Sequence, residues 1–198
     1  MKTILVVYRS NYGFTKTYAQ WLAEALHADL KDGHNMKPQE LSDYDVILFG
    51  GGLYAGGVNG ISLLVKAFPN LRNKALYLFT VGAANVNDET NVAHIRSELS
   101  KVLTQEMQEH IKIFHLRGGI DYPKLSLVHR AMMGMMVKGI RKKPEQELTA
   151  EELTMLETYG ELVDFTHPSN IIPIVQDVEA TLAASSPSST ETAESKAK

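Results

Sequence analysis

A short hydroxyl-bearing loop near the start of the chain has the composition of an anion-binding site. The loop consists of Ser10, Asn11, Tyr12, Gly13, Phe14 and Thr15. It comes just before a helical pattern, so unpaired backbone N–H groups and the positive end of a helix would face a bound phosphate. Gly13 allows the backbone to curve closely around the anion. The same residues also fit an ordinary helix start, with Ser10 or Thr15 as the N-cap.

The loop lacks the signatures of larger nucleotide sites. The chain has no Gly-x-x-x-x-Gly-Lys-Ser/Thr sequence, which argues against a nucleoside triphosphate. It has no Gly-x-Gly-x-x-Gly after the first apolar run, which argues against NAD. A loop built from hydroxyls without a lysine suits a single phosphate group, such as that of FMN.

Two later segments could contact a ring attached to that phosphate. One contains Gly52, Leu53, Tyr54, Ala55 and Gly56, and the other contains Thr80, Val81, Gly82 and Ala83. Five glycines among positions 50–57 cost too much chain entropy for an ordinary connector, so we expect this segment to contact a ligand. The alternatives are a glycine-rich turn with a surface tyrosine and, at 80–83, a plain strand-to-helix turn.

All three segments follow apolar runs that are typical of buried strands. We expect strands at 4–8, near 28–31, and at 46–49, 75–81 and 110–116, with helices near 18–26, 61–68 and 88–103. This alternation predicts right-handed crossovers and a parallel sheet. The expected fold is α/β, a three-layer, doubly wound, five-stranded parallel sheet of order 2-1-3-4-5. Ligands of such sheets bind beyond the carboxyl ends of the strands, where the three segments would meet.

The composition limits the chemistry that the chain can perform. It has 198 residues, 44% of them hydrophobic, and a net charge of −3, which fits one domain and gives no reason to expect nucleic acid. The absence of cysteine excludes disulfides, thiolate metal sites and iron–sulfur clusters, and we expect no metal site. Any electron transfer would therefore use an organic cofactor. No secretory signal or membrane-spanning run is recognisable, so the expected location is the cytoplasm.

Residues 122–143 form a distinctive basic, Met-rich insert without an acidic residue. Its cations are Lys124, Arg130, Lys138, Arg141, Lys142 and Lys143. Its apolar residues at one helical face are Leu125, Val128, Met132, Met135 and Met136. This segment suits a large apolar ligand with carboxylates, or peripheral contact of 124–143 with the inner face of a membrane. A helix that packs on the sheet edge, with solvated cations, explains it equally well.

The end of the chain changes in composition. An amphipathic pattern at 149–165 predicts a closing helix. From residue 179 onward large apolar residues are almost absent, so we expect a domain at 1–178 and a disordered tail at 179–198.

The first loop resembles the phosphate loop of the flavodoxin superfamily. Ser10-x-Tyr12-Gly13-x-Thr15 is similar to Thr/Ser-x-Thr/Ser-Gly-x-Thr, and it departs at Tyr12, whose hydroxyl lies too far from the backbone to act as the family's Thr or Ser does. The resemblance implies a flavodoxin-like fold and FMN as the cofactor. It also implies that Tyr54 stacks on the flavin ring and that residues 80–83 meet its pyrimidine edge.

One branch of that superfamily, the menaquinone-dependent protoporphyrinogen dehydrogenases, resembles the chain from Met1 to about Asp164. The most specific piece is Gly118-Gly119-Ile120-Asp121-Tyr122-Pro123-Lys124, followed by a basic, apolar helical segment, although the insert is less aromatic here. This resemblance implies an FMN-dependent oxidoreductase that passes electrons from a porphyrin-type substrate to a quinone. The alternative is a flavodoxin-type FMN electron carrier without a small-molecule substrate, which acts with a redox partner.

The sequence argues against a flavin-free regulator and offers no clear acid–base catalyst. A flavin-free regulator of the receiver type needs acidic residues after the first strand, and Tyr8-Arg9-Ser10 supplies none. No catalytic residue is identified. His115 lies in an expected strand and His129 on the insert helix, and neither stands out as a general base.

Overall fold

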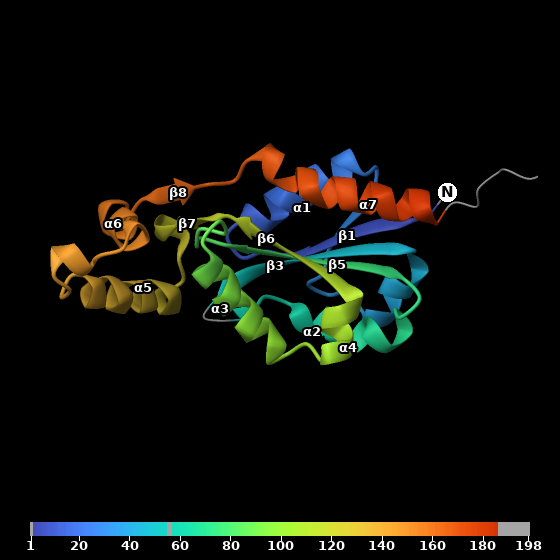
Figure 1. Ribbon diagram of the computed structural model, residues 1–198, viewed down its shortest axis with the longest axis horizontal. Helices are drawn as coiled ribbons and strands as arrows, with labels where there is room; N and C mark the ends of the chain where they lie inside the picture. Colours follow the sequence, from blue (N-terminus) through green and yellow to red (C-terminus); the bar gives the residue numbers. More distant parts are fainter. Residues whose placement is uncertain (1, 55–56, 186–198) are drawn as a thin grey trace, which may run out of the picture.

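A parallel sheet forms the centre of the molecule, and its three central strands are among the most apolar runs of the chain. In the computed structural model, which describes residues 2–54 and 57–185, helices cover both faces of this sheet (Figure 1). The strands are β1 (Ile4–Arg9), β2 (Asp29–Asp32), β3 (Val46–Tyr54), β4 (Gly57–Val58), β5 (Ala75–Gly82) and β6 (Ile111–Arg117). The parallel strands follow the order β2-β1-β3-β5-β6, and β4 pairs antiparallel with the end of β3. The expected order of five parallel strands is confirmed, and β4 is an addition.

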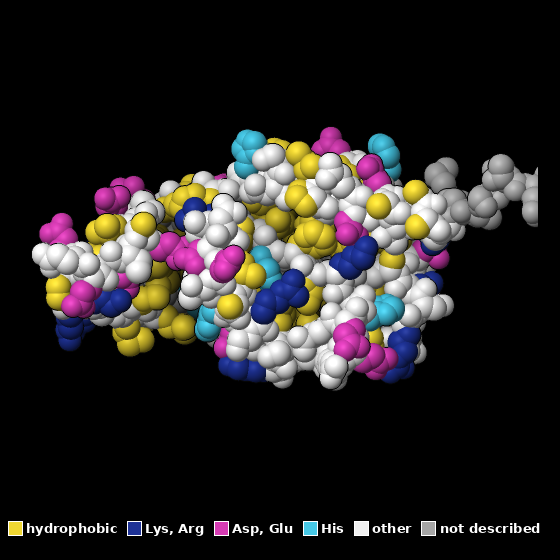
Figure 2. All heavy atoms as spheres, in the orientation of Figure 1, with side chains coloured by type: hydrophobic (Ala, Val, Ile, Leu, Met, Phe, Trp, Pro, Cys, Tyr) yellow, Lys and Arg dark blue, Asp and Glu magenta, His cyan; other side chains and the backbone are white. Residues whose placement is uncertain are grey.

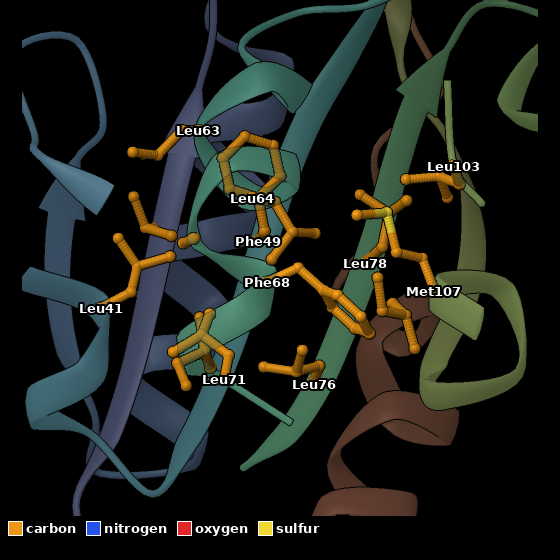
Figure 3. Packing of buried hydrophobic residues seen from close by; sticks show 14 of the residues in the cluster. Leu41, Phe49, Leu63, Leu64, Phe68, Leu71, Leu76, Leu78, Leu103 and Met107 are labelled. Carbon is orange, nitrogen blue, oxygen red and sulfur yellow. The ribbon is translucent and has the colours of Figure 1, made fainter. Parts of the chain in front are cut away.

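Successive side chains of the central strands enter two different cores. One face is covered by α1 (Phe14–Ala25) and α7 (Ile172–Ala184), and the other by α2 (Ile61–Ala67), α3 (Glu89–Ser100) and α4 (Gln105–His110) (Figure 1). Leu5 and Val7 of β1 enter the second core, whereas Val6 enters the first. Figure 3 shows the second core, which contains Phe49 and Phe68. Burial on both faces explains why these strands lack polar alternation.

A small lobe extends beyond the carboxyl ends of the strands (Figure 1). It consists of β7 (Gly119–Asp121), α5 (Leu127–Ile140), α6 (Ala150–Glu157) and β8 (Leu162–Asp164). β7 and β8 pair antiparallel, with Ile120 opposite Val163. A Cβ on Gly119 would lie 2.0 Å from the backbone oxygen of Val163, so only glycine permits this pairing. The pairing attaches the lobe to the rim of the sheet.

The predicted closing helix at 149–165 is wrong. Thr149 caps α6, with Glu152 completing a capping box, but the helix ends at Glu157. Gly160 has a φ of 100°, a left-handed conformation that stops a helix, and the chain then forms β8. The backbone N–H and C=O groups of β8 form their hydrogen bonds with β7. In a helix that continued to residue 165, they would have bonded within the helix.

The helix that closes the domain is α7, which corrects the predicted tail. Residues 179–184 are helical and not disordered, because this part of α7 continues to pack on the sheet. Val178 is fully buried, and the Tyr77 hydroxyl lies 2.9 Å from Asp177 Oδ1 and 2.8 Å from Thr181 Oγ1. Residues 186–198, the remainder of the expected tail, lie outside the described residues.

Candidate functional site

The 10–15 loop joins β1 to α1 at the rim of the sheet. Gly13 precedes the first residue of α1 with a φ of 100°, and its N–H donates to Ser10 Oγ over 3.0 Å. A residue with a Cβ rarely adopts this conformation, so the turn requires glycine. Within the described part of the chain, the N–H groups of Phe14 and Thr15 have no acceptor. The loop therefore offers free donors and a positive helix end to an anion.

The hydroxyl of Tyr54 already lies in this loop. Burial raises the pKa of Tyr54, and the backbone N–H groups of Asn11 and Tyr12 near the hydroxyl lower it by less. The phenol folds back over Gly52, where a Cβ would lie 2.9 Å from the Tyr54 hydroxyl, so this approach also requires glycine. Backbone N–H groups of the loop thus lie near an oxygen atom, as they would near a phosphate oxygen.

The glycine segment at 50–57 is mostly strand. β3 continues to Tyr54, so the expected end of this strand at residue 49 is wrong. Gly50 is needed for packing and not for a turn, because a Cβ there would lie 2.1 Å from the Phe79 ring. Leu53 and Tyr54 face a hollow at the rim. Ala55 and Gly56, which were expected to bind cofactor, lie outside the described residues.

Only part of the 80–83 segment at the end of β5 lines the hollow. Val81, Gly82 and Ala83 line the hollow. Thr80 is fully buried within the sheet, and its hydroxyl lies 2.7 Å from His115 Nδ1. Burial, with a smaller effect of Arg96, lowers the pKa of His115 to about 4. Thr80 and His115 therefore form a neutral structural pair away from the hollow.

The hollow lies where the three predicted segments meet, and α5 covers it. Its volume is about 180 Å³. The lining residues are Tyr12, Phe14, Thr15, Leu53, Tyr54, Val81, Gly82, Ala83, Gly119, Ile120, Leu125, His129, Met132 and Met133. Apart from two tyrosines and one histidine, no lining side chain can ionise. This lining suits a flat, uncharged ring whose phosphate lies at the 10–15 loop, but at about 180 Å³ the hollow must widen to admit one.

The sequence did not predict which residues of the lobe line the rim hollow. Gly119, Ile120, His129 and Met133 were not expected to bind a ligand. The Met-rich pattern of the insert was the available signal. Met132 of α5 lines the hollow, and so does Leu125, which precedes the helix and does not lie on its face.

The other residues of that face lie elsewhere. Val128 and Met135 are 67% and 68% exposed, so the expected common face does not point into the hollow as a whole. Met136 lines a second, adjacent hollow between α5 and α6. Some apolar residues of α5 thus line the two hollows, and others lie on the outer surface.

Three aromatic rings hold α5 over the rim hollow. The Tyr12 hydroxyl lies 2.5 Å from His129 Nδ1 and accepts a hydrogen bond of 3.3 Å from the Ser126 N–H, at the start of α5. The His129 ring lies parallel to the Tyr54 ring with 5.5 Å between their centroids. A third ring between them would need about 7 Å, two van der Waals contacts of about 3.5 Å each. A ligand ring can therefore stack on this face of Tyr54 only when α5 moves outward.

The described residues contain neither a cluster of metal-binding side chains nor a membrane-spanning helix. Residues 2–54 and 57–185 contain no group of three histidine or acidic side chains that could hold a metal ion. No helix in the same ranges is long and apolar enough to cross a membrane.

Comparison with known proteins relates the chain to one family. A family model described as a flavodoxin domain matches residues 5–147. Among solved structures, oxidised flavodoxin 2 from Bacillus cereus is 22% identical and covers 58% of this chain and 85% of its own, with a TM-score of 0.40. A WrbA-like flavodoxin from Agrobacterium tumefaciens is 16% identical and covers 89% and 99%, with a TM-score of 0.40. A flavoprotein in complex with FMN from Lactobacillus acidophilus is 17% identical and covers 59% and 93%, with a TM-score of 0.40. The curated proteins gave no match.

Proposed function

The chain belongs to the flavodoxin-domain family, and from this premise we propose that its rim hollow binds FMN non-covalently for electron transfer. The observation that carries the proposal is the set of backbone N–H groups at the 10–15 loop, next to the Tyr54 oxygen and beside a hollow with no carboxylate or basic aliphatic side chain. A phosphate would replace that oxygen, and the ring would lie in the hollow. FMN, when bound, supplies hydride and single-electron chemistry that no side chain of this cysteine-free chain can supply.

The chain's own residues would bind and orient the cofactor. Ser10, Thr15 and the backbone of the 10–15 loop would hold the phosphate. Tyr54 would stack on the ring after it leaves the loop. The backbone of Val81, Gly82 and Ala83 would meet the ring edge, and α5 would exclude water from its far side.

Reconstitution with FMN tests this proposal. The purified chain should bind FMN with a shifted visible spectrum and quenched flavin fluorescence. Ser10→Ala should weaken binding about 10-fold or more, because one hydrogen bond to a charged group contributes about 1.5–3 kcal/mol. Ser100→Ala, which removes a hydroxyl bonded to Ser97 O on α3, is the matched control. A chain that folds yet leaves added FMN unperturbed would reject the proposal.

We further propose that the chain is an oxidoreductase with its own organic substrate and not only an electron carrier. The support is the cover over the rim hollow, because α5 and its cluster with Tyr12 would block a partner protein from a ring bound there. The resemblance of the 118–124 segment suggests protoporphyrinogen as the substrate and a quinone as the acceptor. Protoporphyrinogen oxidation with menadione as acceptor is the assay for this activity. FMN binding without such turnover, but with rapid electron exchange with a flavodoxin reductase, would favour the carrier.

The outward face of α5 supports a proposed contact with an anionic membrane surface. Leu127, Val128 and Met135 are 83%, 67% and 68% exposed, and Figure 2 shows hydrophobic side chains gathered over this lobe. Lys138 lies among them, and segment 122–143 has no acidic residue. Apolar residues interleaved with cations are typical of helices that lie in a membrane interface.

Sedimentation with lipid vesicles tests this contact. The chain should bind vesicles that contain phosphatidylglycerol and not vesicles of phosphatidylcholine alone. Met135→Gln should reduce binding several-fold. Ile172→Gln, at a half-exposed position on α7, should leave it unchanged. Equal binding by both variants would contradict the contact.

A further inference from the structure

A second hollow adjoins the first and lies between the sheet rim, α5 and α6. Its volume is about 280 Å³, and it shares Ala83, Ile120 and Met133 with the rim hollow. The other walls come from the β7–β8 pair and from α6. They are mainly apolar, with Met136, Met155 and Phe165 among them. A molecule bound here would lie next to a ring in the first hollow.

Two donors in this hollow have unused hydrogen-bonding capacity. Tyr122 is only 5% exposed, and its buried hydroxyl has no hydrogen-bond partner within the described residues. Burial raises the pKa of Tyr122, with a smaller effect of Tyr159, so the phenol stays protonated and able to donate. A buried hydroxyl without an acceptor costs about 1–3 kcal/mol. A ligand oxygen that reached this hydroxyl would remove that cost.

Arg117 is the second donor. Its guanidinium stacks on Phe165 at 3.7 Å from the ring centroid, and Nε donates to the Ala83 carbonyl over 3.2 Å. No ion pair of Arg117 occurs among residues 2–54 and 57–185. The aromatic ring and one carbonyl hold the cation in place, but they leave its charge without a counter-ion.

The one carboxylate in the wall is already bonded elsewhere. Glu151 Oε1 accepts from the Asn85 N–H over 2.5 Å, and Oε2 accepts from Asn91 Nδ2 over 3.1 Å. One oxygen thus binds the segment between β5 and α3, and the other binds the first turn of α3. The hollow therefore combines apolar walls, an unpaired cation and a free hydroxyl donor.

We propose that this second hollow binds a compact, flat, apolar anion whose acidic group lies against Arg117 and Tyr122. The apolar walls fit a ring system, and both free groups are donors, so the ligand must bring acceptor oxygens. Its role as the substrate rests on the function proposed above, because only a bound flavin would make the neighbouring space redox-active. Its binding does not depend on that function.

The size of the hollow limits the ligand. Sites for drug-sized molecules measure about 300–1,000 Å³, and this hollow of about 280 Å³ lies below that range. Two or three fused rings with one acidic group suit it. A tetrapyrrole would enter only after α5 and α6 separate. The geometry thus favours a smaller substrate than the porphyrin that the sequence resemblance suggests.

Calorimetric titration with 2-naphthoate tests the site, because its neutral amide, 2-naphthamide, has nearly the same shape. Naphthoate should bind about tenfold or more tightly than the amide, the usual gain from a charge-assisted hydrogen bond. Arg117→Gln should remove this preference, whereas Arg117→Lys, which keeps the charge, should retain part of it. Tyr122→Phe should weaken naphthoate binding about three- to tenfold. Lys138→Gln, an outward-facing cation on α5, is the control and should change nothing.

Three outcomes would overturn the proposal. One is equal affinity for naphthoate and naphthamide, and another is an unchanged preference in a folded Arg117→Gln variant, with folding checked by circular dichroism. The third is displacement of naphthoate by FMN, which would locate the probe in the rim hollow. The titration is done first without FMN and then with it. A preference for naphthoate in a chain that fails to bind FMN would reject the proposed function and leave this site intact.

Discussion

Removal of one hydroxyl by Tyr12→Phe should release the first turn of α5 from the rim hollow. The Tyr12 hydroxyl bonds both to His129 Nδ1 at 2.5 Å and to the Ser126 N–H at 3.3 Å. Each such bond contributes about 0.5–1.5 kcal/mol, so the closed position loses about 1–3 kcal/mol. The open population should therefore rise about 5- to 150-fold.

Amide hydrogen exchange measures this opening directly. The amides of residues 130–133, whose acceptors lie in the first turn of α5, should exchange faster by that factor, whereas the amides of β5 should not change. Tyr44→Phe is the matched control, because its hydroxyl binds Asp29 Oδ2 over 2.8 Å at the opposite end of the sheet. Association of FMN should also become faster, since the Tyr54–His129 spacing of 5.5 Å must widen to admit a ring.

Unchanged α5 exchange in a folded Tyr12→Phe chain would refute the reasoning. It would mean that packing of Val137 and Ile140, the buried residues of α5, holds the helix in place without the hydroxyl. Faster exchange in β5 as well would mean that the substitution destabilises the whole domain and does not act on α5 alone.

Three other substitutions or conditions test the fold that supports the site. Tyr18→Phe removes a buried hydroxyl that donates to a carbonyl at 2.7 Å and accepts from an amide at 2.8 Å, so Tm should fall by roughly 3–10 °C; an unchanged thermal melt would contradict this. Because the pKa of His115 is lowered from 6.5 to about 4 in the folded state, the unfolded state takes up the proton first, and stability present above pH 6.5 is lost between 6.5 and 4. Linkage limits this loss to about 3 kcal/mol, and partial solvent exposure reduces it to about 1 kcal/mol. Chemical denaturation at several pH values in that range should show that the free energy of unfolding depends less steeply on pH in His115→Asn than in the unsubstituted chain. An equal pH dependence in both would assign the loss to carboxylates. Gly119→Ala, which brings a Cβ to 2.0 Å from Val163 O, should cost the lobe about 1–3 kcal/mol, and limited proteolysis should cut the lobe but not the sheet.

The sequence determined the sheet and the rim of the site. Runs such as Leu5–Val7 and Ile47–Phe49 are continuous apolar segments, and only burial on both faces of a parallel sheet accommodates them. Strand order and right-handed crossovers then place the ends of β1, β3 and β5 together. For this reason the sequence predicted that the three loops meet at one rim of the sheet. Gly13 was also predictable, because its role depends on its own backbone conformation.

The sequence-based predictions were wrong where a local pattern was compatible with two different conformations. The glycines at 50–52 indicated a loop, but β3 continues through them because Phe79 and Tyr54 need the space that side chains would fill. The pattern at 149–165 suited one helix, but Gly160 and the partner strand β7 divided it. Residues 179–184 contain one large apolar side chain, Leu182, yet they extend α7 because the helix already packs on the sheet.

The lobe and the second hollow were decided by the tertiary structure alone. The sequence showed that α5 is apolar and basic, but helical periodicity does not say which side of a helix meets which neighbour. Pairing of Ile120 with Val163 fixes where the lobe begins and ends, and so it places Met133 between the two hollows and Met135 in solvent. The contacts that decide this join residues more than forty positions apart, such as β7 and β8, and no local preference of the chain encodes a distance of that kind.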